Sequence, residues 1–398
     1  MKDSTLWNGV HRLAVRRGRC RGSSRLPTGV RPSAGERRAW RAAQVLVWGV
    51  GVVLLALLLF VPNVGIHAFW NGLIPVAPAL LALAPGVWRN VCPMGSTALV
   101  ARHAGLSRRR RISEASQARL SLVGVVLLLA IVPLRHVVLD TDGPATALAI
   151  AILALAAVVS CGHFEWKSAW CSGACPVHPV EKLYGTKPLV TVANAHCGPC
   201  ERCVVTCPDS SVAMTPLSAT PRPSARLAGR LMVGGFAGFV WGWFHVPDYA
   251  GGEGWSHLST AYGLPLAGMA ASLLLFTLLD YLGGPSRRRL VASAFAAAAI
   301  ACYYWYRLPA LVGFGPFPGD GALVDLRDSL PAWLPAASRA VTTTFFAWWF
   351  LGRSSVVRSW SIRPLERIAD LGGHGVSLIC GAGDAPRSGS TAPARRTS

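Results

Sequence analysis

Residues 45–61 read VLVWGVGVVLLALLLFV and contain no charged side chain. A helix needs about 20 residues to cross a hydrocarbon core of roughly 30 Å, and this run approaches that length. Lipid offers no partners to free backbone groups, so such a run must be helical where it crosses a bilayer. Seven further apolar runs contain at most one charged residue each: 69–87, 120–139, 145–160, 231–246, 262–282, 290–306 and 334–351. The sequence therefore predicts an all-α polytopic membrane protein with about eight transmembrane helices.

The positively charged residues are distributed unevenly between the two predicted sides of the membrane. Only 14% of residues are charged and 52% are hydrophobic, yet the net charge is +21. If residues 1–44 lie inside, alternation of the eight runs places all but four of the 39 Lys and Arg residues inside as well. The exceptions are Arg135, Arg307, Arg327 and Arg339. This is the positive-inside pattern, so we expect a multi-pass protein of the bacterial inner membrane with both termini cytoplasmic and a lipid bilayer, not nucleic acid, as its surroundings.

The strongest chemical signal is the run CGPCERCVVTCP at residues 197–208. Its cysteines are Cys197, Cys200, Cys203 and Cys207, in the spacing C-x2-C-x2-C-x3-C-P that is typical of bacterial 4Fe-4S ferredoxins. The first three thiolates converge on one cube, and the fourth belongs to the other cube in two-cluster ferredoxins. Disulfides do not fit a reducing cytoplasmic loop. Structural zinc remains an alternative, although zinc sites usually set two C-x2-C pairs further apart.

A second cysteine motif precedes this run. Cys171 and Cys175 form C-x3-C-P on the same predicted face of the membrane. Cys92, followed by Pro93, and Cys161 lie at predicted inner helix ends. Together with the ferredoxin run these four give eight thiols, the number that two 4Fe-4S clusters require. Cys161 also fits the role of a small buried hydrophobe. The other cysteines, Cys20, Cys302 and Cys380, have no partner at a useful spacing.

These residues divide the chain into five parts. We expect a basic cytoplasmic leader at 1–44 and a four-helix membrane region at 45–160, with an inner loop at 88–119. A small ferredoxin-like iron–sulfur segment at 161–230 follows on the cytoplasmic side. A second four-helix membrane region at 231–351 and a basic cytoplasmic tail at 352–398 complete the chain.

Cys92-Pro93, Cys171–Pro176 and Cys197–Pro208 resemble the membrane-bound 4Fe-4S polyferredoxins of nitrate and nitrous-oxide respiration and of oxidase assembly. The resemblance covers residues 43–210, and members often have a second cysteine where this chain has Trp88. It implies one-electron transfer between a cytoplasmic donor, such as a soluble ferredoxin or a flavoprotein reductase, or a quinone, and a membrane oxidase or reductase. It also leaves open an accessory role in maturing a partner metalloenzyme.

Other chemistries fit the sequence less well. No two histidines lie within one predicted span, so a haem held between two helical imidazoles is not expected. No dinucleotide fingerprint, P-loop or G-x-S-x-G motif occurs. We therefore expect an electron-transfer component with no catalytic site of its own. A zinc-containing membrane binding or transport protein is the alternative from another class.

Overall fold

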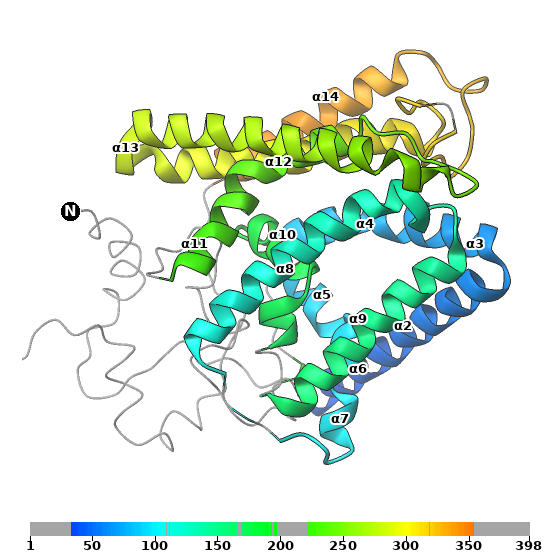
Figure 1. Cartoon of the computed structure of the whole chain (residues 1–398), viewed down its shortest axis with the longest axis vertical. Helices are drawn as coiled ribbons and strands as arrows, with labels where there is room; N and C mark the ends of the chain where they lie inside the picture. Colours follow the sequence, from blue (N-terminus) through cyan, green and yellow to red (C-terminus); the bar gives the residue numbers. More distant parts are fainter. Residues whose placement is uncertain are drawn as a thin grey trace, which may run out of the picture.

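The computed structural model describes residues 33–108, 110, 112–164, 169–190, 192, 195–196, 222–317 and 319–353. The four cysteines of the ferredoxin run lie outside these residues, as do residues 1–32 of the expected leader and residues 354–398 of the expected tail. Within the described part the chain is helical and contains no strand (Figure 1). Five helices are long and apolar enough to cross a membrane. The protein is thus a helical membrane protein, as the apolar runs predicted.

The N-terminal half, residues 33–163, is built from two long helical hairpins. Its helices are α2 (Ala34–Phe60), α3 (Pro62–Ile66), η1 (His67–Leu73), α4 (Ile74–Leu83), α5 (Pro85–Val91), α6 (Pro93–Ala98), α7 (Val100–His103), α8 (Glu114–Leu134), η2 (Arg135–Leu139) and α9 (Gly143–His163). A capping box of Ser33 and Glu36 starts α2 by satisfying backbone N–H groups of its first turn.

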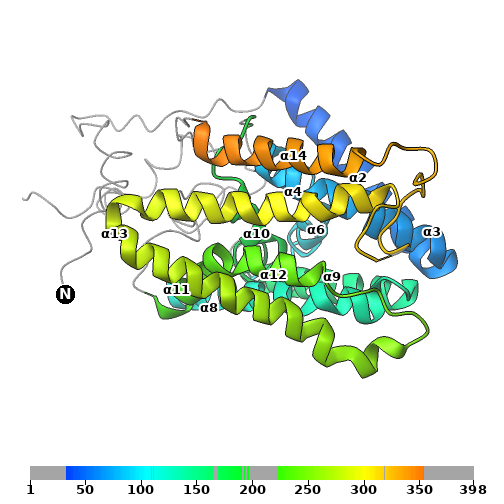
Figure 2. The same ribbon diagram turned by 90° about the horizontal axis from the view of Figure 1, so that it is seen from above.

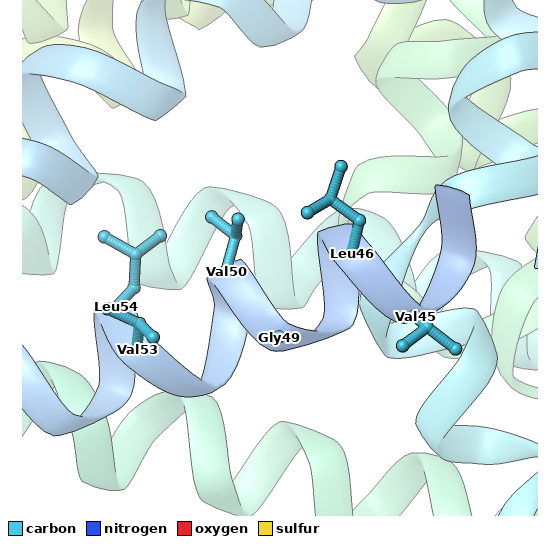
Figure 3. Close-up of a pocket in the computed structure, with 6 residues that line it drawn as sticks. All are labelled: Val45, Leu46, Gly49, Val50, Val53 and Leu54. Carbon is cyan, nitrogen blue, oxygen red and sulfur yellow. The ribbon is translucent and has the colours of Figure 1, made fainter. Parts of the chain in front are cut away.

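Helix α2 turns most of its apolar side chains outward. Leu58 is its only buried residue, whereas Val45 is 70% exposed. Figure 3 shows a shallow furrow on this outward face, lined by Val45, Leu46, Gly49, Val50, Val53 and Leu54. In water such a surface would be costly, so α2 has the character of a lipid-facing helix.

The C-terminal half, residues 222–353, packs as a second layer above the first (Figure 1). Its helices are α11 (Pro223–Arg230), η5 (Leu231–Gly235), α12 (Phe236–Trp243), η6 (Glu253–His257), α13 (Leu258–Leu311), α14 (Leu334–Ala347) and η7 (Trp348–Gly352). Helix α13 bends at Gly284, where φ is 63° and ψ is −175°. Because only glycine adopts this backbone readily, Gly284 turns α13 into the two arms seen in Figure 2.

Helices α12 and α13 meet backbone to backbone. A Cβ atom added to Gly238 would overlap the carbonyl oxygen of Gly268, and one added to Gly268 would overlap the carbonyl oxygen of Gly238. The Ser272 hydroxyl donates to the Gly234 carbonyl oxygen at 2.6 Å in the same interface. Small residues permit this approach, which is how helices associate where no hydrophobic driving force acts between them.

The helices agree with the predicted apolar runs, but the number of crossings remains a prediction. Four of the five long apolar helices correspond to the first four expected runs. The fifth contains the bent helix α13, which includes the runs 262–282 and 290–306. The continuous helix α11–η5–α12 and the helix α14–η7 occupy the runs 231–246 and 334–351. Those two helices are not among the five.

Candidate metal centre

The C-x3-C-P motif lies on an insert that packs inside the helical bundle. After α9 the chain forms the short helices η3 (Trp170–Ala174) and α10 (Val177–Tyr184), which we call the cysteine insert. A Cβ atom at Gly124 of α8 would come within 2.7 Å of the Gly173 carbonyl oxygen, so the insert touches the α8 backbone. At its other end Tyr184 is 1% exposed and its ring contacts Phe236 and Phe350. The insert is therefore held by both halves of the protein.

Cys175 joins the two helices of the insert. Its N–H donates to the Trp170 carbonyl oxygen at 2.9 Å, and Pro176 then begins α10. Burial raises the pKa of the Cys175 thiol to about 12 and the neighbouring Cys92 adds to the rise, while backbone N–H groups of Val177 and His178 act against it. The thiol therefore ionises only beside a positive partner such as a metal ion. The two N–H groups are placed to stabilise the Cys175 thiolate that results.

Three more cysteines lie near Cys175. Cys92 occupies the break between α5 and α6 and is close enough to influence the Cys175 pKa. Cys161, in the last turn of α9, is 2% exposed and shares an apolar cluster with Cys171 and Cys175. The structure thus gathers the predicted ligands Cys92, Cys161, Cys171 and Cys175 at one end of the bundle, which we call the cysteine end. Cys302 packs against a different cluster.

The chain is anchored at the cysteine end immediately before the ferredoxin run. The Ala195 N–H donates to the side-chain oxygen of Asn90 at 3.1 Å, and Asn90 is 1% exposed. His196 is 4% exposed, and its Nε2 lies 3.5 Å from Nε2 of Gln44 in α2. Asn90 is two residues from Cys92, and His196 is next to Cys197. The described residues just before the run therefore lie beside the helix that ends at Cys92.

A buried ion pair connects α5, which ends just before Cys92, with α10, which begins just after Cys175. Arg89 of α5 bonds to Glu181 of α10, with side chains that are 8% and 6% exposed. His178 Nδ1 lies 3.9 Å from the Glu181 carboxylate. Sequence reasoning missed this pair because Arg89 and Glu181 are far apart in the chain. The only signal was the carboxylate of Glu181 close behind the cysteine motif.

The donors suit iron–sulfur chemistry, but the described residues do not complete a site. Thiols predominate at the cysteine end, and a helix N-terminus faces Cys175. In the described ranges no group of three or more His, Cys, Asp or Glu side chains is arranged to hold a metal ion. Cys197, Cys200, Cys203 and Cys207 fall outside those ranges, so their role as ligands stays a prediction.

Replacing Glu181 tests the ion pair. We expect Glu181→Gln to lower the free energy of unfolding by about 1–3 kcal/mol, because buried Arg89 loses a charged acceptor but keeps a neutral one. Thermal unfolding in detergent would show a Tm lower by several degrees. Exposed Glu253 provides the matched control in Glu253→Gln. Equal Tm values for the two variants would contradict a stabilising role for the pair.

Comparison with protein-family models found no match, and comparisons with curated proteins and with solved structures found none either.

Proposed function

We propose that this protein is a membrane-bound iron–sulfur electron carrier. It passes single electrons between a cytoplasmic donor, such as a soluble ferredoxin or a flavoprotein reductase, or a quinone, and a membrane oxidase or reductase. The observation that carries the proposal is the anchoring of Ala195 and His196 against Asn90 and Gln44. These contacts hold the two residues that precede the ferredoxin run at the cysteine end, which carries Cys92 and Cys175.

The cysteines divide between two 4Fe-4S clusters in this proposal. Cys197, Cys200 and Cys203 hold one cube, and Cys207 turns toward the other. Cys171 and Cys175 serve the second cube, and Cys92 and Cys161 complete the two sets. When bound, such clusters accept and donate one electron at a time.

The protein supplies the surroundings of these clusters. Trp170, Ala174 and Ala98 exclude water beside Cys161 and Cys175. The N–H groups of Val177 and His178 stabilise negative charge on the Cys175 sulfur. A donor approaches from the side predicted to be cytoplasmic. A barrier of roughly 30 Å separates this end from the other side, so we expect electrons to enter and leave on the same face.

Iron analysis of anaerobically purified full-length protein tests the proposal. We expect roughly eight irons and eight sulfides per chain, as two cubes require, and low-temperature EPR signals after dithionite reduction. Cys203→Ser is expected to lose iron. The control Cys302→Ser keeps it, because Cys302 packs among apolar side chains away from the cysteine end. A colourless protein that retains zinc and gives no EPR signal would refute the electron-carrier proposal.

A further inference from the structure

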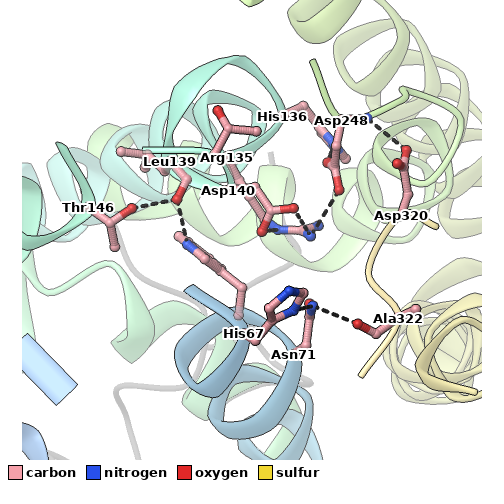
Figure 4. Close-up of polar contacts among 12 residues, drawn as sticks. His67, Asn71, Arg135, His136, Leu139, Asp140, Thr146, Asp248, Asp320 and Ala322 are labelled. Atoms are coloured by element: carbon pink, nitrogen blue, oxygen red, sulfur yellow. Dashed lines mark hydrogen bonds and ion pairs between the residues drawn. The ribbon is translucent and has the colours of Figure 1, made fainter. Parts of the chain in front are cut away.

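Charged side chains are buried around η2, which follows the C-terminal end of α8 (Figure 4). Arg135, the first residue of η2, donates to both carboxylate oxygens of Asp140, from Nε at 3.0 Å and from a terminal nitrogen at 2.7 Å. The same terminal nitrogen donates to Asp248 at 3.2 Å. The three side chains are 5%, 10% and 10% exposed. One guanidinium therefore serves two buried carboxylates.

Two further groups complete what we call the Arg135 network: Arg135, His136, Asp140, Asp248 and Asp320. His136 Nδ1 lies 2.5 Å from Asp248 Oδ1, and its Nε2 is buried without a hydrogen-bond partner among the described residues. The Asp248 N–H donates to the Asp320 carboxylate at 2.8 Å. Arg135, His136 and Asp140 belong to the N-terminal half, whereas Asp248 and Asp320 belong to the C-terminal half. The network thus crosses the seam between the halves.

The elements around the network add one more cation. Arg307 of α13 donates to the Asn71 side-chain oxygen at 2.7 Å and to the Trp70 carbonyl oxygen at 2.6 Å. The Asn71 amide nitrogen lies 3.0 Å from His67 Nδ1 in η1. The rings of Trp70 and Trp243 lie 5.7 and 5.2 Å from the Arg135 guanidinium. Tyr303 of α13 also interacts with Arg135.

The charges of these groups do not balance when all the carboxylates are ionised. With His136 neutral, Asp140, Asp248 and Asp320 carry three negative charges, against the two positive charges of Arg135 and Arg307. Unbalanced charge is costly in a low-dielectric site, and adjacent carboxylates relieve it by sharing a proton. We propose that the Arg135 network is a proton-binding site, in which Asp140 holds one exchangeable proton that it shares with Asp248.

The surroundings of the two carboxyls favour Asp140 over Asp248 as the holder of the proton. Burial raises the pKa of Asp140 to about 7, against the opposing effect of Arg135. For Asp248, Arg135 and the His136 hydrogen bond outweigh burial and hold the pKa below its usual range. Burial also raises the pKa of Asp320, which is only half-buried and connects the network to the surface of the loop before α14. Loss of the proton leaves two negatively charged carboxylates, Asp140 and Asp248, facing each other across the contact between the two halves.

Infrared spectroscopy of the full-length protein tests the proposal directly. Across a pH titration we expect the carbonyl stretch of one buried carboxylic acid to disappear near neutral pH. Asp140→Asn removes this band, and Asp140→Glu retains a titrating acid. The control Asp325→Asn keeps the band because Asp325 is exposed and paired with Arg327. A band that survives unchanged in Asp140→Asn, or no such band in the wild type, overturns the proposal.

The dependence of Tm on pH gives a second measurement. Asp140 binds its proton more tightly in the folded chain, with a pKa of about 7, than at its ordinary value of 3.8. Its contribution to stability is therefore complete below pH 4 and is lost as the pH rises through 7. We expect the wild-type Tm to fall over this range more steeply than the Asp140→Asn Tm. Parallel curves would overturn the proposal, and iron content, which tests the electron-carrier function separately, should not change in Asp140→Asn.

Discussion

Arg135→Met is expected to lower the free energy of unfolding by about 3–5 kcal/mol, because it leaves the buried carboxylates of Asp140 and Asp248 without their shared cation. Methionine fills much of the space of the arginine stem, so lost packing contributes little. Such a loss is a large fraction of the stability of most proteins. We therefore expect little folded Arg135→Met to accumulate in membranes, as measured by fluorescence-detected gel filtration of a tagged chain.

The matched control for this experiment is Arg327→Met. Arg327 and Asp325 also form an ion pair, but their side chains are 46% and 51% exposed. An exposed pair contributes little to stability because water and salt screen it, so this variant should accumulate as the wild type does. The triple variant Arg135→Met/Asp140→Asn/Asp248→Asn removes the cation and both carboxyl groups and should recover much of the loss. Equal accumulation of Arg135→Met and Arg327→Met would show that the buried cation is dispensable.

The second large effect is expected at the glycine contact between α12 and α13. Gly268→Val places a side chain where the Gly238 carbonyl oxygen already lies, so the two helix backbones must separate. Overpacking of this kind costs about 3 kcal/mol where backbone atoms, which cannot rotate away, are the obstacle. We expect a markedly lower Tm and a smaller yield of monodisperse protein.

Gly263→Val is the control for the glycine contact. Gly263 lies on the same arm of α13, and a Cβ atom there meets nothing within 4 Å. The control carries the same change in backbone freedom and helix propensity without the collision. A similar Tm for Gly263→Val and Gly268→Val would mean that α12 and α13 are not packed as closely as described.

The sequence predicted the helices of this protein well, because a long apolar run has one stable conformation in lipid. The run 145–160 lies wholly within α9, for example, and Gly284-Pro285 marks the bend between two runs. It also predicted that Cys92, Cys161, Cys171 and Cys175 would lie at one end. Those inferences needed only local composition and the alternation of helices across a membrane.

Contacts between distant segments could not be predicted in this way. The run 120–139 contains Arg135, and Asp140 follows in the next turn, but nothing in the sequence selects Asp248 as its second partner. The sequence likewise placed residues 169–185 in an inner segment, whereas the structure packs them against α8, Phe236 and Phe350. Hydropathy records how apolar a segment is and not which neighbour covers it.

The position of the cysteine insert has a consequence for the order of events during synthesis. Tyr184 is covered by Phe236 and Phe350, which leave the ribosome only after the whole insert has been made. Chains fold from the N-terminus as they are produced, so the Tyr184 end of the insert stays uncovered on the growing chain until α12 and η7 have been made.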